Sequence, residues 1–447
     1  MSERIMRKRI KLNLKENDTI IKAACNSEPS KELSQINHDG LAYIFSFLTI
    51  DERLQAEHVC KKWKEASQMS WYDIKNLDLN DDSCIKKYFN TDFVIKNNIY
   101  TILSRCGKYL TNLSVNNDFD STVIPIIAKY CSNLIKLELK LSNYDSEFFN
   151  NSFSKMNKLE CLVIPNYQHS IHENQPCIFE SVTKSIKTFR FRCASGETLP
   201  NNFATEFARF NNLNILTLEN WKIDNDIVEL LEIKKDTLTH LSLAGSTFND
   251  SKSSIGKLIN LEYLNVGCTL KSLTNENLIN IINNCCKLKY INISWCKDIT
   301  KPTFMYLKNL KNLNDMLLSN VGIDDDIIKQ FKNLKTLECA GSTLITDKSI
   351  RHILKNSPTL ERLVIGGTNV TTDTIHYAIE IKKLYKDNKL TIILNGSVIQ
   401  QYIENNSCRR IHCEAYQVTD NLIVSKDFFE IMYLFMRCRF TPVQEIE

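Results

Sequence analysis

Apolar residues recur between residues 110 and 395 in a short pattern, L-x-x-L-x-L, with conservative replacements. Eleven copies begin at Leu110, Leu134, Leu159, Ile186, Leu213, Leu238, Leu261, Leu288, Leu313, Leu334 and Leu360, and a weaker twelfth begins at Leu390. From the first to the eleventh copy the pattern advances 250 residues in ten steps, a mean period of 25. A fixed period of this length is the signature of a repeat architecture.

Each copy alternates apolar and polar residues, which predicts a short strand with one buried face. Between copies the period becomes helical. "TNENLINIINNC" begins with Thr274 as a predicted N-cap and places Leu278 and Ile281 on one face, and "TDKSIRHILKNS" repeats this arrangement from Thr346. One strand and one helix per repeat predict an α/β solenoid, curved, with parallel strands on its concave side and helices on its convex side.

Residues 36–79 have a helical period and no strand pattern. They predict three short helices, of which the second is capped by Asp51 and the third is anchored by Trp63. The apolar positions of these helices are Leu41, Ile44, Phe45, Leu48, Leu54, Val59 and Trp63. About 40 residues make a marginal core, since chains of that size usually need a partner.

Composition and charge narrow the possible classes of function. The chain is 43% hydrophobic and 24% charged, and its net charge of +4 is too balanced to predict nucleic-acid binding across the molecule. No apolar run of about 18 residues exists, so no membrane span is expected. Sixteen cysteines behind an amino terminus without an apolar signal core predict reduced thiols and a cytoplasmic or nuclear location.

Three of these cysteines, Cys285, Cys286 and Cys296, lie within twelve residues and raise the question of a metal site. When each repeat is numbered from its first apolar residue, Cys296 occupies position 9. The same position holds Ser142, Ser246, Thr269, Ser342 and Thr368 in other copies. We therefore expect a structural turn residue, because zinc needs four converging ligands that this segment does not supply. No metal and no cofactor are predicted.

The copy "NCCKLKYINISWCKDIT" resembles the cysteine-containing subtype of the leucine-rich repeat, and its period lies within the roughly 20–29 residues of that class. Upstream, "LAYIFSFL…VCKKWKEAS…W" resembles an F-box. The resemblance implies that residues 36–79 bind the Skp-type adaptor of a cullin–RING ubiquitin ligase. The implied interface and its support are Ile36, Leu41, Ile44, Phe45, Leu48, Leu54, Val59, Cys60 and Trp63.

One departure from the F-box pattern concerns its first residues. The family usually begins with Leu-Pro, and here the matching pair is Ile36-Asn37. Loss of the proline is expected to weaken adaptor binding, while Asn37 retains the ability to cap a helix. The alternative interpretation is that the three helices are only a cap on the solenoid.

A substrate surface is predicted on the concave face, where positions 3, 5 and 7 of each strand point because side chains alternate. Position 3 gives His240, Tyr263 and Tyr290 in three consecutive copies, a predicted aromatic ladder. Position 7 is small in the copies that follow, which predicts a shallow trough beside the ladder. Trp295, at position 8, either extends this surface or is buried at the strand end.

A second candidate on the same face is a basic spot formed by Arg190 and Arg192, suited to an acidic or phosphorylated segment. Both candidates compete with an ordinary solvated strand face. An enzyme is not expected, since no Gly-rich phosphate loop, HExxH or GxSxG motif occurs.

The predicted organisation is a disordered basic tail (1–35), the F-box (36–79), a helical connector and N-terminal cap (80–109), the repeats (110–395), and a C-terminal cap and tail (396–447). The expected function is substrate recognition in a Skp–cullin–F-box ligase, with an unknown protein substrate and no nucleic-acid or membrane partner. The alternative function is a non-ligase scaffold that joins protein partners through its repeats.

Overall fold

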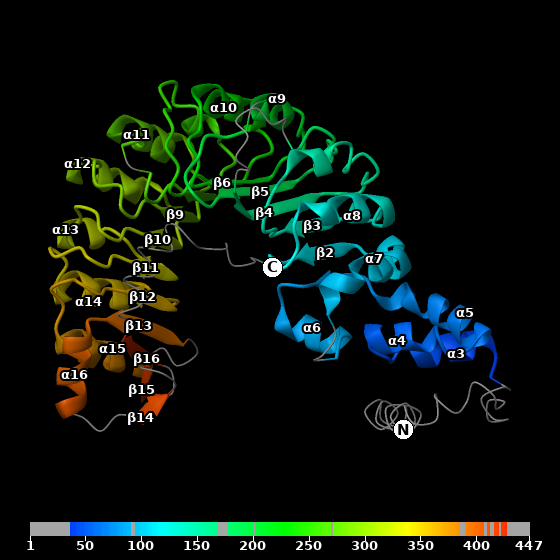
Figure 1. Ribbon diagram of the computed structural model, residues 1–447. Helices are drawn as coiled ribbons and strands as arrows, with labels where there is room; N and C mark the ends of the chain where they lie inside the picture. The colour runs from blue at the N-terminus through cyan, green and yellow to red at the C-terminus, as the bar shows by residue number, and fades with distance from the viewer. Residues whose placement is uncertain are drawn as a thin grey trace. The chain divides into compact units, whose positions relative to one another are not determined.

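The computed structural model describes residues 36–90, 94–168, 178–200, 202–269, 271–384, 389–405, 409–411, 415–419 and 422–426 (Figure 1). The predicted basic tail, residues 1–35, and the apolar segment 428–440 lie outside the described residues. The chain divides into two compact units. Unit 1 extends to Cys161 and includes Ile178–Thr183, and unit 2 holds the remainder.

Unit 1 begins with three short helices, as the sequence predicts. They are α3 (His38–Phe45), α4 (Ile50–Ala56) and α5 (Lys61–Met69), followed by the single turn η2 (Ser70–Asp73). Asn37 caps α3 by accepting a hydrogen bond from the Gly40 N–H at 2.8 Å. The predicted cap of the second helix was wrong, because Thr49 precedes α4 and its N–H donates to Glu52 Oε2 at 2.9 Å. The Asp51 carboxylate instead accepts from the Asn90 N–H at 3.1 Å.

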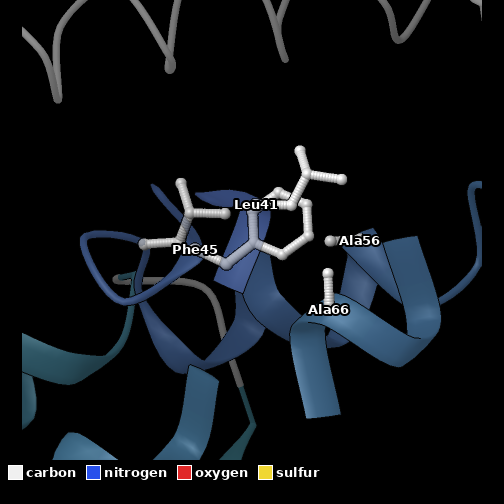
Figure 2. Packing of buried hydrophobic residues seen from close by; sticks show 5 residues of the cluster. Leu41, Phe45, Ala56 and Ala66 are labelled. Carbon is white, nitrogen blue, oxygen red and sulfur yellow. The ribbon is translucent and has the colours of Figure 1, made fainter. Parts of the chain in front are cut away.

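The core of the three-helix segment is small. Its buried residues are Leu41, Phe45, Leu48, Ala56 and Ala66. Figure 2 shows Leu41 and Phe45 pointing toward Ala56 and Ala66. The Trp63 ring meets the Phe45 ring edge-on at 5.1 Å between centroids, which closes one side of the core.

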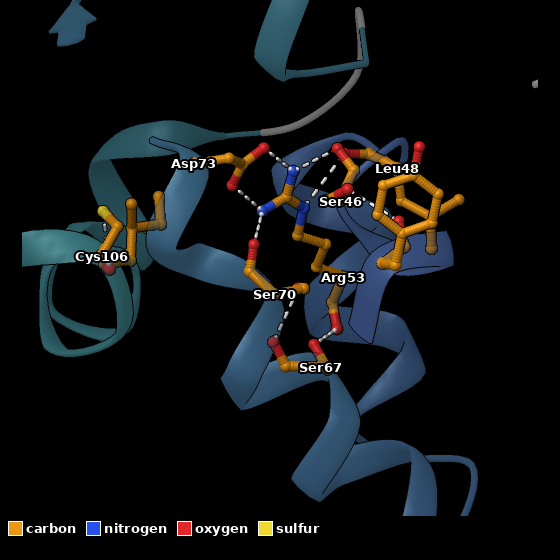
Figure 3. Close-up of polar contacts among 9 residues, drawn as sticks. Ser46, Leu48, Arg53, Ser67, Ser70, Asp73 and Cys106 are labelled. Carbon is orange, nitrogen blue, oxygen red and sulfur yellow. Dashed lines mark hydrogen bonds and ion pairs between the residues drawn. The ribbon is translucent and has the colours of Figure 1, made fainter. Parts of the chain in front are cut away.

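A buried arginine holds the other side of the segment (Figure 3). Arg53, only 1% exposed, donates from Nε to the Leu48 carbonyl at 3.1 Å and from Nη2 to the Ser46 carbonyl at 2.8 Å. Its Nη1 donates to the Ser70 carbonyl at 2.7 Å. Both terminal nitrogens also pair with the Asp73 carboxylate, at 2.7 and 2.8 Å. One guanidinium therefore joins the end of α3, the body of α4 and the turn η2.

The connector is helical, with α6 (Asp82–Tyr88), α7 (Ile95–Cys106) and η3 (Gly107–Tyr109). An ion pair links it to the F-box-like helices: Arg105 Nη2 lies 2.8 Å from Glu57 Oε2, and the Glu57 side chain is 7% exposed. The repeat sheet also begins earlier than predicted. Strand β1 (Asn76–Asp78) pairs in parallel with β2 (Asn112–Val115), so the end of the three-helix segment already belongs to the sheet.

Unit 1 continues with β3 (Lys136–Leu139), which pairs in parallel with β2, and with the helical turns η4 (Ser121–Val123), α8 (Ile124–Tyr130) and η5 (Ser146–Phe149). Strand β4 (Cys161–Tyr167) lies where the two units meet in the sequence. In unit 2 the repeat strands are β5 (Thr188–Cys193), β6 (Ile215–Glu219), β7 (His240–Ser242), β8 (Tyr263–Asn265), β9 (Tyr290–Asn292), β10 (Asp315–Leu317), β11 (Thr336–Glu338), β12 (Arg362–Val364) and β13 (Leu390–Leu394). Each pairs in parallel with the next, so the predicted solenoid is confirmed.

The helical segments of unit 2 are α9 (Phe203–Ala208), α10 (Asn225–Leu230), η6 (Leu231–Lys234), η7 (Ile255–Lys257), α11 (Asn275–Asn284), α12 (Lys301–Phe304), η8 (Met305–Asn309), α13 (Asp325–Ile328), α14 (Asp347–Asn356), α15 (Thr372–Leu384) and α16 (Gly396–Asn405). Helices α10 to α14 lie on the outer side of strands β6 to β12 (Figure 1). The predicted N-caps are confirmed, since Thr274 accepts from the Asn277 N–H and Thr346 from the Lys348 N–H. Among the described residues, no helix has the length and apolarity needed to cross a membrane.

The last repeat strand is followed by three further strands that the sequence pattern did not reveal. They are β14 (Arg409–Ile411), β15 (Ala415–Thr419) and β16 (Leu422–Lys426). Strand β16 pairs in parallel with β13, and β15 and β14 follow in antiparallel order. The region predicted as a C-terminal cap therefore extends the sheet beyond the repeats.

The core of unit 2 is a stack of apolar rows. Within one repeat, positions 1, 4 and 6 are buried completely, as Leu261, Leu264 and Val266 show. The parallel register places the same position of each copy side by side, for example Leu264 opposite Leu241 and Ile291. Each repeat thus covers its neighbour's apolar face, which supplies the burial that one repeat alone lacks.

We predict that Arg53→Ala loosens the three-helix segment by about 3 kcal/mol, because it leaves the Asp73 carboxylate and three buried carbonyls without their donor. Hydrogen exchange along the full chain measures this locally, with faster exchange expected in α3 to α5. Arg351→Ala is the control, since its ion pair with Asp373 is exposed and such pairs contribute at most about 1 kcal/mol. Unchanged exchange in α3 to α5 would contradict the role given to Arg53.

Candidate functional site: the F-box-like helices and the concave strand face

The residues proposed for adaptor binding fall into two groups. Those in the helical core or half-buried around it are Leu41, Phe45, Leu48, Ile36, Ile44, Leu54 and Trp63. Val59 and Cys60, between α4 and α5, are exposed, and Val59 keeps 48% of its surface. The first group shapes the segment, and only Val59 and Cys60 present a largely open surface.

Further exposed apolar side chains lie on the same segment, at positions that the sequence argument did not select. They are Tyr43, Met69 and Tyr72. The Tyr43 ring packs edge-on against Phe47 at 5.1 Å between centroids. The sequence pattern named only the apolar positions of the helical stripe, and these three residues lie outside that set. Their apolar character could have indicated a binding surface from the sequence, since exposed apolar side chains grouped on a small domain mark interaction surfaces.

The aromatic ladder is present on the strand face opposite the apolar core. Leu241, Leu264 and Ile291 are fully buried, so the preceding position-3 residues of β7, β8 and β9 lie on the concave side. Ring centroids of His240 and Tyr263 are 5.6 Å apart, and those of Tyr263 and Tyr290 are 4.1 Å apart with an interplanar angle of 10°. The stacking predicted from the sequence is confirmed.

The ladder is uncharged at neutral pH. Burial raises the pKa of the Tyr263 hydroxyl to about 12, and burial also raises the pKa of Tyr290. Burial lowers the pKa of the His240 imidazole below its ordinary value. Tyr263 is 9% exposed, so the middle ring is covered on both faces and the outer rings present the ladder's open surface.

The basic spot is also present, but it contains a carboxylate. Arg190 and Arg192 alternate with the buried Phe191 on β5, so they share the concave face with the ladder. Arg192 lies opposite Glu219 in the register of β5 and β6. Burial raises the pKa of Glu219, while a hydrogen bond donated by the Ser242 hydroxyl and the two guanidiniums favour its charged form. The spot therefore has a smaller net charge than the two arginines alone imply.

Comparison with known proteins identifies the amino-terminal part. The F-box domain family matches residues 33–75 of this chain. These residues coincide with α3 to η2, and parallel repeat strands follow them. The chain contains an F-box domain followed by leucine-rich repeats.

Two curated relatives are similar to this F-box protein. A Caenorhabditis elegans protein whose name describes an RNA-binding protein is 23% identical over 77% of this chain and 55% of its own length. An Arabidopsis thaliana F-box/LRR-repeat protein is 21% identical over 82% of this chain and 54% of its own length. The chain thus spans about half the length of these relatives.

Solved structures similar to this F-box protein include an internalin from Listeria monocytogenes, with a TM-score of 0.43 and 16% identity over 66% of this chain and 83% of that one. A leucine-rich-repeat protein of Leptospira interrogans gives a TM-score of 0.34 and 19% identity over 65% and 62% of the two chains. The repeat assignment rests on this F-box protein's own period and on its parallel strands.

The predicted trough beside the ladder was wrong. The position-7 residues Ala244, Ser294, Ser319 and Ala340 are almost completely buried, so they leave no open floor. The position-7 residue lies past the three-residue strand. The carbonyl of this residue accepts a hydrogen bond from the position-8 N–H of the preceding repeat. Examples are Cys268 to Ser294 at 2.8 Å and Trp295 to Ser319 at 2.9 Å. Small residues at position 7 belong to this repeated turn.

Trp295 occupies an unusual backbone position in the F-box protein. Seven successive copies place position 8 in the left-handed region, at Asn220, Gly245, Cys268, Trp295, Asn320, Gly341 and Gly367. Glycine and asparagine suit this conformation, whereas a bulky residue there costs roughly 1–2 kcal/mol. Trp295 has a φ of 64° and a half-buried ring, with Lys297 Nζ 5.3 Å from the ring centroid. It lies three residues past Asn292, the last residue of β9.

The cysteines have structural roles. Cys296 Sγ donates to the Val266 carbonyl of the preceding repeat at 3.2 Å and lies 3.7 Å from Thr269 Oγ1. Burial raises the pKa of Cys285 to about 12, so its thiol stays protonated at neutral pH. Over the part of the chain that the structure describes, no group of histidine, cysteine or carboxylate side chains could hold a metal ion.

We predict that Tyr263→Phe removes one phenol that titrates near pH 12 rather than 10. The folded state disfavours ionised Tyr263, so the unfolded state gains an advantage as the pH rises from about 10 to about 12. Absorbance titration of the phenolate, wild type minus variant, reports the loss of Tyr263 together with the change at Tyr290, whose pKa Tyr263 helps to raise. A difference curve centred near pH 10 would show that the ladder is open to solvent.

Proposed function

We propose that this F-box protein is the substrate-recognition subunit of a Skp–cullin–F-box ubiquitin ligase. The observation that carries the proposal is an F-box, residues 33–75, continued in the same compact unit by the first strands of a repeat stack. One part of the chain has the form of an adaptor-binding domain, and the other part offers a strand face for a protein partner.

The proposed mechanism is proximity. The F-box docks on the Skp-type adaptor, the concave strand face holds a protein substrate, and other subunits transfer ubiquitin. Holding substrate lysines beside the charged conjugating enzyme raises their effective concentration, so this subunit needs no catalytic residue of its own. The proposal places the protein in the cytoplasm or the nucleus, where such ligases act.

The departure from the family's Leu-Pro start is compatible with this role. Proline favours the first turn of a helix by fixing its backbone, and Asn37 begins α3 by a different means, through its side-chain hydrogen bond to the Gly40 N–H. Ile36 is half-buried and packs against the F-box core. The entry into the first helix is therefore preserved without the proline.

Two contacts within unit 1 hold the F-box against the helical connector that precedes the repeats. Arg105 on α7 pairs with the buried Glu57 carboxylate, and Asn90 donates to Asp51. A carboxylate this buried holds its partner closely, because separating the pair would leave a desolvated charge. The F-box and the helical connector of unit 1 are therefore held to each other by paired, desolvated groups.

We predict that Val59→Glu abolishes co-purification of a Skp-type adaptor and a cullin with the full chain. Val59 is 48% exposed, so the change places a charge on the proposed docking surface without disturbing the core. Ile135→Glu is the matched control, because Ile135 is 41% exposed at the start of the β3 repeat in the same unit.

Retention of adaptor by both variants would reject this docking surface. Failure of the unchanged protein to retain adaptor and cullin would favour the alternative, a non-ligase scaffold that joins partners through its repeats. Circular dichroism of both variants checks that the helices are intact.

A further inference from the structure

Two buried polar atoms on the concave face, Arg190 Nε and Glu338 Oε2, lack a hydrogen-bond partner within the described ranges of the chain. A buried polar atom left unpaired is destabilising, so such atoms need an explanation. Glu338 is the sharper case, because its carboxylate is 3% exposed and only its other oxygen is paired, with Arg362 Nε at 3.1 Å.

The two atoms belong to one face of one sheet. Phe191 and Leu337 are buried completely on the core side, so the alternating neighbours Arg190 and Glu338 lie on the concave side. Arg190 is at position 5 of β5, and Glu338 is at position 5 of β11. The aromatic ladder on β7, β8 and β9 lies between the two ends.

The two ends differ in charge. At β5 and β6, two guanidiniums, Arg190 and Arg192, surround one carboxylate, Glu219, which leaves one positive charge. At β10 to β12, Arg362 pairs with Glu338, and the second carboxylate, Asp315, lies two strands away from that guanidinium, which leaves one negative charge. The unpaired donor Arg190 Nε therefore lies at the positive end, and the unpaired acceptor Glu338 Oε2 lies at the negative end.

We propose that the concave face from β5 to β11 binds an extended segment of a partner protein with opposite charges at its two ends. A carboxylate of the segment pairs with Arg190, a flat side chain lies against the ladder, and a lysine or arginine reaches Glu338. The proposal rests on the proposed function, since it describes the substrate segment of that receptor. Complementary charges at fixed spacing give both orientation and specificity.

The spacing of the strands sets the length of this segment. Six strand separations of about 4.8 Å join β5 to β11, which is about 29 Å. An extended peptide advances about 3.3 Å per residue, so roughly nine residues separate the two charges. The site suits a carboxylate better than a phosphate, because the positive end carries one net charge and a phosphate brings nearly two.

The test is selection of a displayed library of random 14-residue peptides on the full chain. We expect enriched peptides with an acidic residue and a basic residue about nine positions apart and an aromatic residue between them. Arg190→Gln and Glu338→Gln should each weaken binding of a selected peptide about tenfold or more. Lys348→Gln, an exposed change on α14, should leave binding unchanged.

A double-mutant cycle assigns each contact. Replacing the peptide's acidic residue by its amide should weaken binding to the wild type and add nothing in Arg190→Gln, and the basic residue should behave in the same way toward Glu338→Gln. The peptide-side changes keep the test decisive if a protein variant fails to fold. Independent losses, enriched peptides without polarity, or no enriched peptide would overturn the proposal.

Two further arms test other occupants. Tighter binding of a peptide with phosphoserine at the acidic position would overturn the choice of carboxylate. Binding of a mixed-sequence RNA that is lost in Tyr290→Ala would overturn a protein partner. The selection needs no adaptor, so its outcome is separate from that of the adaptor co-purification.

Discussion

The burial of one face of every short strand against the apolar rows of its neighbours is the constraint on which the repeat stack depends. Positions 1, 4 and 6 point into that core, and Leu261, Leu264 and Val266 leave no surface exposed. Because strand side chains alternate, fixing the core face also fixes the opposite face. The stacked rings of β7 to β9 therefore follow from the same register that holds the leucines together.

The F-box is stabilised differently, because three short helices cannot bury enough apolar surface alone. Its core contains five buried residues, and polar bonds complete it. Arg53 supplies most of them, by gathering three carbonyls and the Asp73 carboxylate. Exposed apolar side chains such as Val59 are then available to a partner, which would cover them on binding.

The sequence was sufficient to predict the repeat fold because the period occurs eleven times. An irregular copy does not obscure a pattern that the other copies share. It also placed Tyr263 and Tyr290 in a stack, since a parallel register aligns equal positions. Strand β1 was missed because a single three-residue strand carries no period. The prediction of a trough was wrong because position 7 is small to fit the turn that follows the strand, not to leave an open surface. The period of the apolar residues contains no information about that turn.

Charge placement was harder to foresee than the ladder. Arg190 and Arg192 were visible as a pair, but the carboxylate of Glu219 that reduces their charge comes from the next repeat. Whether Glu338 is exposed or desolvated depends on its neighbours in space, which a single strand pattern does not specify. Three-dimensional pairing thus decides the electrostatics, whereas the period decides the fold.

The uniform turn at position 8 has a consequence for changes in chain length. Among the first eleven copies, the length of one repeat ranges from 21 residues, between Leu313 and Leu334, to 27 residues, between Leu261 and Leu288, yet these strands keep their register. The difference is absorbed on the helical side, where α13 has four residues and α11 has ten. Insertions or epitope tags are therefore accommodated between a helix and the next strand, and the spacing of side chains along the concave face stays constant.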